Sequence, residues 1–210
     1  KKDIQDYGSV DVLGALGAKS VKSTVAFKKK AIGAYWIRGY ETWQHKKAEL
    51  VKGYQAGLEL CANSEWLCEH AAMLSHQPCE LIRPGIHTKF FAHKPRKNKR
   101  PLVVGALYSA RPIKRSKFAS KAVKNAGGMQ LWMLASRPPP NSILKNKVCV
   151  QPTRVVKRGL MQAVDIWIAP STSEGLHLPP MEAGLCGAAL VANSNRRGGM
   201  LDYANENTAL

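Results

Sequence analysis

Residues 101–193 alternate short apolar runs with polar or amphipathic segments, and this alternation constrains the fold more than any other feature of the sequence. The apolar runs have the length of strands and predict strands at 101–108, 129–135, 147–151, 164–170 and 188–193. The segments between them predict helices at 114–125, 153–163 and 179–185. Alternating strands and helices favour βαβ units and a parallel, doubly wound α/β sheet.

The first part of the chain carries similar elements with less regular spacing. Strands are predicted at 31–37, 58–64 and 79–82. Ser64 is placed to cap the N-terminus of a helix that follows it to about residue 74. Gly14, Gly17 and the lysine run 28–30 predict loops or element ends. We expect residues 1–90 to form part of a second, Rossmann-like domain.

A basic stretch separates the two parts. Residues 94–100, KPRKNKR, contain five basic residues and no apolar side chain, a composition that is typical of a solvated linker. The predicted organisation is therefore a partial N-terminal domain (1–90), a basic linker (91–100) and a Rossmann-like domain (101–210). The C-terminal end of that last domain is expected to be missing.

The chain is strongly basic. Thirty-two Lys and Arg against 14 Asp and Glu give a net charge of +18, which favours polyanionic partners such as nucleotide phosphates, nucleic acid or an anionic membrane. No helix-turn-helix, RNA-recognition or zinc-finger pattern supports nucleic acid. The five cysteines are odd in number and include no C-x-x-C pair, which argues against zinc and a disulfide framework. No spanning helix or signal peptide is predicted.

Residues 164–187 form the most informative stretch. An apolar strand is followed by the polar turn 171–175, and ligands of open α/β sheets bind at that edge. Pro179 and Pro180 suit the first positions of the next helix, Glu182 is expected in its first turn and Gly187 at its end. A helix N-terminus at this edge suits a diphosphate, and a carboxylate beside it suits a ribose diol.

These residues resemble the C-terminal domain of glycosyltransferase family 4, which has the GT-B fold. The matching positions are Ser171, Glu174, Gly175, Leu176, Leu178, Pro179, Met181, Glu182, Ala183, Cys186 and Gly187. The segment 198–204 resembles the family's G-G-x-x-[DE]-[YF] motif, and Gly105 with Lys114 resembles its first strand and basic residue. Residues 35–43 resemble a segment of the rhamnosyltransferase-like branch.

The resemblance implies transfer of a sugar from a nucleotide-sugar donor to an acceptor hydroxyl, with retention and without an obligatory metal or other cofactor. It also implies that residues 1–90 belong to the acceptor-side domain and that residues 101–210 form the domain that binds the nucleotide sugar. Glu182 would hold the ribose, and the second carboxylate, Glu174, the donor sugar. Backbone amides of Gly175, Leu176 and His177 would lie near the sugar phosphate. Lys114 would neutralise charge on the leaving group. The acceptor is expected to be a carbohydrate or a lipid-linked molecule, and the location the cytoplasm, with membrane contact at its cytoplasmic face.

Three positions depart from the family pattern. His177 and Arg115 stand where the family usually has glycine, and Ala106 follows Gly105 where the family often has arginine. Arg115 or Arg111 is the candidate replacement for that arginine. The short N-terminal part and the abrupt end predict a fragment or shortened member of such an enzyme. Two alternatives stay open, an inactive remnant of a glycosyltransferase and a basic nucleic-acid-binding module.

Overall fold

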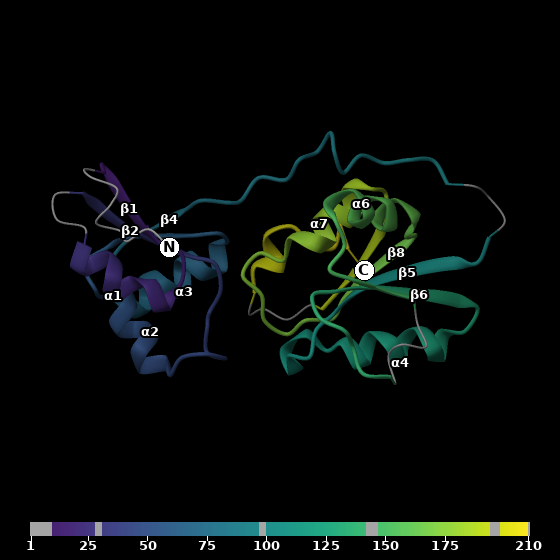
Figure 1. Ribbon diagram of the computed structural model, residues 1–210, viewed down its shortest axis with the longest axis horizontal. Helices are drawn as coiled ribbons and strands as arrows, with labels where there is room; N and C mark the ends of the chain where they lie inside the picture. The colour runs from purple at the N-terminus through teal and green to yellow at the C-terminus, as the bar shows by residue number, and fades with distance from the viewer. Residues whose placement is uncertain (1–9, 28–30, 97–99, 142–146, 194–197, 210) are drawn as a thin grey trace. The chain divides into compact units, whose positions relative to one another are not determined.

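The computed structural model describes residues 10–27, 31–96, 100–141, 147–193 and 198–209. The chain forms two compact units (Figure 1). Unit 1 comprises the residues up to Pro84 together with Glu174–Leu176, and unit 2 comprises Gly85–Ser173 and the residues from His177 onward. The lysine run 28–30 and the centre of the basic stretch, residues 97–99, lie outside the described residues.

Unit 1 is a parallel sheet with helices between its strands. The strand order is β1-β2-β3-β4, and every neighbouring pair is parallel. Its elements are β1 (Val12–Ala15), α1 (Ala18–Phe27), β2 (Ile32–Ile37), α2 (Lys47–Tyr54), β3 (Glu59–Ala62), α3 (Glu65–Ser75) and β4 (Cys79–Leu81). Alternate strand residues such as Tyr35, Ile37 and Leu60 are buried against helix residues such as Leu50 and Leu67, so one core lies on one face of the sheet.

Most elements of unit 1 agree with the sequence prediction. Ser64 caps α3 as expected, because its hydroxyl accepts a hydrogen bond from the amide of Leu67 at 3.4 Å. The prediction of a loop or element end was wrong for Gly14, whereas Gly17 lies between β1 and α1 as expected. Gly14 lies inside β1, which pairs with β2 along its whole length, so tertiary pairing outweighs the weak strand propensity of glycine.

Unit 2 is a five-stranded parallel sheet with the order β7-β6-β5-β8-β9. Helix α4 packs on β5 and β6 on one face, and α6 and α7 lie on the other (Figure 1). The elements are β5 (Leu102–Tyr108), η2 (Pro112–Lys114), α4 (Ser116–Ala126), β6 (Met129–Ala135), β7 (Lys147–Val150), α6 (Arg154–Ala163), β8 (Ile166–Ala169), α7 (Leu178–Leu185), β9 (Ala189–Ala192) and η3 (Gly199–Asp202). The predicted doubly wound α/β domain is confirmed. Its strand order reverses beside β5, where such sheets bind ligands.

Two local expectations in unit 2 need correction. The helix expected at 114–125 is divided into η2 and α4, because Arg115 between them has a left-handed backbone with φ of 48°. Glu182 lies in the second turn of its helix rather than the first, because α7 begins at Leu178. Gly187 follows α7 with φ of 89°, a conformation that favours glycine, as expected.

The segment that precedes β5 packs onto unit 2. Phe91 is buried in the core that also contains Trp167, and Ile86 and Phe90 pack against it. The division between the units therefore falls after Pro84, earlier than the boundary expected at residue 90.

Two arginines of the basic stretch are built into unit 2 instead of lying in a solvated segment. The guanidinium of Arg96 donates to the carbonyls of Gln162, Cys186 and Gly187 at 2.9–3.1 Å. Arg100 makes a two-pronged ion pair with Asp165 at 2.8 and 2.9 Å. Both arginines thus satisfy groups at the ends of helices and strands. Within the described ranges, no helix is long and apolar enough to cross a membrane.

Candidate functional site

Unit 2 contains a cavity of about 810 Å³ at the carboxyl ends of β5, β6 and β7. This is the sheet edge at which the strand order predicts a ligand. The cavity is lined by Leu107, Tyr108, Ser109, Ala110, Arg111, Lys114, Leu134, Ala135, Ser136, Arg137, Pro138, Gln151, Pro152, Lys157 and Pro179. Pro179 belongs to the first turn of α7, so the lining reaches the N-terminal end of that helix.

The charge of the cavity has one sign. Arg111 and Lys114 come from the segment after β5, Arg137 follows β6, and Lys157 comes from α6. None of the lining residues is acidic. Four cations and a helix N-terminus make this edge a suitable place for a multiply charged anion.

Hydrogen bonds hold the segment that carries Arg111 and Lys114. The hydroxyl of Ser116 accepts from the amide of Ser109 at 2.9 Å and donates to the carbonyl of Ser109 at 3.1 Å. The amide of Thr172, which follows β8, donates to the carbonyl of Ile113 at 2.9 Å. These hydrogen bonds connect the turn after β5 to α4 and to the turn after β8. The backbone that carries Arg111 and Lys114 is therefore fixed in position.

Lys157 also pairs with Glu182 of α7. Glu182 is only 8% exposed. It is not a lining residue itself, but its carboxylate contacts Lys157, which is one. The ammonium of Lys157 also lies 5.5 Å from the ring centroid of the buried Phe91. A buried carboxylate is stable in its charged form only with such a partner.

His177 precedes α7 in a left-handed conformation, with φ of 64°. Its side chain is buried, and Nδ1 lies 3.3 Å from the sulfur of Met200. The hydroxyl of Tyr203 donates to the carbonyl of His177 at 2.9 Å. Arg115 has the same kind of backbone, and its guanidinium lies over the ring of Phe118 at 5.1 Å. His177 and Arg115, which stand where the glycosyltransferase motif usually has glycine, thus both have a left-handed backbone that glycine adopts with the least strain.

The structure brings together some of the predicted site residues. Lys114 lines the cavity, and Glu182 adjoins it through Lys157. Arg115 and His177 are not among the lining residues, and their donor contacts stay predictions.

Gly105 lies inside β5 opposite Trp167 of β8. A Cβ atom on Gly105 would approach Cε3 of Trp167 to 2.6 Å, so packing against the indole accounts for the glycine. Glu174, Gly175 and Leu176 belong to unit 1 by their contacts, whereas the cavity belongs to unit 2 alone. The donor contacts predicted for these residues also stay predictions.

Sequence reasoning missed Arg137 and Lys157. Arg137 follows the carboxyl end of a correctly predicted strand, so the rule that ligands bind at this edge would have found it. Lys157 carries no such signal, because its position beside Glu182 depends on how α6 packs on α7.

No protein-family model and no curated protein matches the chain. Solved structures do match it, at 13–17% identity. Sucrose-phosphate synthase from Thermosynechococcus elongatus has a TM-score of 0.79 at 14% identity, with 98% of this chain and 61% of that one covered. The catalytic domain of starch synthase IV from Arabidopsis thaliana, in a structure bound to ADP and acarbose, has a TM-score of 0.73 at 13% identity, with coverages of 97% and 60%. A glycosyltransferase from Rickettsia africae has a TM-score of 0.71 at 17% identity, with coverages of 97% and 62%.

These matches establish the fold. The chain has the α/β architecture of GT-B glycosyltransferases, with a Rossmann-like domain. It spans 60–62% of the length of these three structures and 42–44% of the length of others that match.

Proposed function

We propose that this chain is the donor-binding part of a glycosyltransferase, which transfers a sugar from a nucleotide sugar to an acceptor hydroxyl with retention at the anomeric carbon. The observation that carries the proposal is the cavity of unit 2, with four cations, no acidic lining residue and the first turn of α7. A nucleoside diphosphate is an anion of suitable charge and size for such a site. On the sequence motifs, we also propose that the enzyme belongs to glycosyltransferase family 4, near its rhamnosyltransferase-like branch.

The fold of the neighbours supports this choice of ligand. The starch synthase structure contains a nucleoside diphosphate, ADP, together with the carbohydrate acarbose. We infer that the cavity takes the nucleoside diphosphate portion of the donor. The acceptor is a carbohydrate or a lipid-linked molecule, and the reaction takes place in the cytoplasm without an obligatory metal.

The chemistry requires stabilisation of a departing diphosphate. As the bond between the anomeric carbon and the phosphate oxygen breaks, negative charge develops on the diphosphate, and fixed cations lower the energy of that transition state. We assign this role to Lys114, with Arg111 and Arg137 beside it. Glu182 holds the ribose diol and Glu174 the donor sugar. Since Lys157 already pairs with Glu182, donor binding would exchange part of that ion pair for ribose hydroxyls.

The test is thermal unfolding of the full chain with UDP, GDP, dTDP, ADP and their common sugar conjugates. A ligand that binds only the folded state stabilises it by about 2.7 kcal/mol at a hundredfold excess over Kd. We expect one nucleotide to raise the midpoint of the wild type. Each variant is compared with its own ligand-free midpoint, so any loss of intrinsic stability is separated from loss of binding.

Two variants and two matched controls assign the site. Lys114→Gln and Glu182→Gln should each reduce the shift. Lys124→Gln, on the exposed side of α4, and Glu206→Gln, near the C-terminus, change charge equally and should keep it. No shift with any nucleotide would contradict the proposal. Binding without sugar transfer, in an enzyme that includes the remaining part of the fold, would favour an inactive remnant.

A further inference from the structure

A long segment of unit 2, residues 101–164, has basic side chains but no acidic ones. Residues 101–164 contain twelve Lys and Arg side chains and not one Asp or Glu. Three of these cations line the cavity from the segments after β5 and β6, and Lys157 joins them from α6. Others lie on the outward side of α4, away from the cavity lining.

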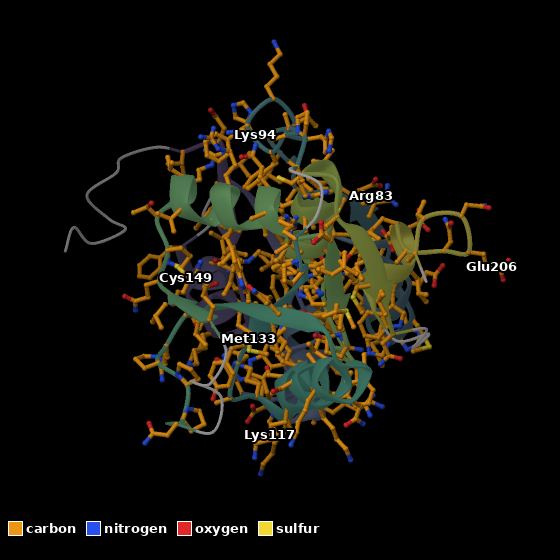
Figure 2. All side chains as sticks on the ribbon, turned by 90° about the vertical axis from the view of Figure 1, so that its right-hand side faces the viewer. Arg83, Lys94, Lys117, Met133, Cys149 and Glu206 are labelled. Atoms are coloured by element: carbon orange, nitrogen blue, oxygen red, sulfur yellow. The ribbon has the colours of Figure 1, made fainter. Side chains whose placement is uncertain are left out.

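Helix α4 presents a basic stripe. Lys117, Lys121 and Lys124 are spaced by four and three residues, so they share one side of the helix, and all three are exposed. The opposite side, with Ala119 and Val123, is buried against β5 and β6. In Figure 2 the labelled Lys117 lies on the outer side of the helix, away from Met133 of β6.

An apolar ring lies beside this stripe. Phe118 is 53% exposed and does not lie on the buried side of α4. Its ring lies 5.1 Å from the guanidinium carbon of Arg115, and Lys121 follows it by three residues. Exposed cations beside an aromatic ring suit the headgroup region of an anionic bilayer, where the lysines meet acidic headgroups and the ring leaves water.

The basic stretch 94–100 is a weaker candidate for the same contact. Arg96 and Arg100 are committed to carbonyls and to Asp165 of unit 2, as described above. The lysines of α4 have no ion pair with any described residue. The lysines of α4 are therefore open to a partner, unlike these two arginines.

We propose that the outer side of α4, made of Lys117, Phe118, Lys121 and Lys124 with Arg115 at its start, is a docking surface for an anionic lipid bilayer. The lysines meet acidic headgroups, and the ring of Phe118 enters the boundary between headgroups and acyl chains. A nucleic-acid duplex would also attract the lysines through its backbone, but its bases are stacked inside the helix and give the exposed ring no partner. The proposal is independent of the donor site, because it uses none of the residues that line the cavity.

The experiment is co-sedimentation of the full chain with vesicles at low salt. One vesicle is phosphatidylcholine alone, and the other contains about a third phosphatidylglycerol. The test variant changes Lys117, Lys121 and Lys124 to Gln. The matched control changes Lys19, Lys22 and Lys52 to Gln, which removes the same charge from exposed positions on helices of unit 1. A third variant, Phe118→Ser, leaves the charge unchanged, and binding to a DNA duplex is measured for all of them.

We expect binding to the anionic vesicle only, weakened by roughly a hundredfold in the α4 triple variant and much less in the control. Phe118→Ser should weaken vesicle binding several-fold and leave any DNA binding unchanged. Equal losses in the two triple variants, or no vesicle binding by the wild type, would overturn the proposal. It would also fail if Phe118→Ser had no effect and the α4 lysines were needed for duplex binding, which would make the surface a nucleic-acid site.

Discussion

Lys157 of α6 and Glu182 of α7 form an ion pair that joins the cavity of unit 2 to its interior. The carboxylate is largely buried, with its side chain 11% exposed, whereas the lysine side chain retains 26% exposure. Lys157 therefore lines the cavity and also contacts Glu182, the residue predicted to bind ribose.

Removing one partner of this pair should be costly. Lys157→Met leaves the carboxylate of Glu182 buried without its cation, and we expect a loss of about 3 kcal/mol, the lower part of the range for buried pairs. The double variant Lys157→Met with Glu182→Gln removes both charges and should lose less than the sum of the single changes. Urea unfolding of the four proteins in this cycle measures the coupling. Additive losses would mean that the contact adds nothing to stability.

Gly105→Ala tests the packing explanation for this glycine. The added methyl group would lie 2.6 Å from the indole of Trp167 and 2.9 Å from Val164, both buried. Displacing them should cost about 1–3 kcal/mol. Gly159→Ala, at a helix position where nothing lies within 4 Å of the new Cβ, serves as the control and should be neutral or stabilising. Comparable midpoints for the two variants would contradict the explanation.

Arg115→Gly tests backbone strain. The position has φ of 48°, and a left-handed conformation costs a residue with a side chain roughly 1–2 kcal/mol. The variant gives up the contact with Phe118 and the lower chain entropy of a non-glycine residue, which offset the relief of strain, so we expect its unfolding free energy to lie close to that of wild type and about 0.5–1 kcal/mol above that of Arg115→Ala. Arg115→Ala, which keeps the strain and loses the same contact, should be less stable than wild type. A glycine variant no better than the alanine variant would argue against strain.

His70 makes unit 1 sensitive to acid. Burial and the nearby charge of Lys47 lower the pKa of His70 from its ordinary value of 6.5, and its ring stacks on Trp66. Because the folded state favours the neutral ring, stability is complete above about pH 6.5 and falls as the pH drops toward the lowered pKa. His70→Phe keeps a ring and removes the titration. Urea unfolding at about pH 7.5 and about pH 5.5 should show a smaller loss for the variant, and equal losses would exclude His70 as the cause.

Local patterning was sufficient for much of the fold. The regular apolar runs predicted the strands of unit 2. The capping role of Ser64 was visible in the sequence, and its hydroxyl accepts the expected amide hydrogen bond. Local patterning failed where tertiary pairing decides the outcome. Strand β1 was not predicted, because Gly14 lies inside it and glycine has a weak strand propensity; its parallel pairing with β2 specifies the strand.

The candidate site divides in the same way. Lys114 and Glu182 could be named because they lie in motifs of contiguous sequence. Lys157 could not, because nothing near it in the sequence specifies that α6 brings it to Glu182. The strain at Arg115 and His177 was also hidden, since a side chain at a left-handed position is visible only once the backbone angle is known.

Because residues 85–96 pack onto unit 2, they must be exchanged together with it when relatives recombine. A recombination event that joined a foreign sequence at Pro101 would remove Phe91 from the core that contains Trp167. It would also remove Arg96 from the carbonyls of Cys186 and Gly187, which follow α7. Exchange between relatives that preserves the second unit must therefore carry the chain from Gly85 onward. The segment that must move as one piece therefore begins at Gly85, before the first strand of the alternating pattern.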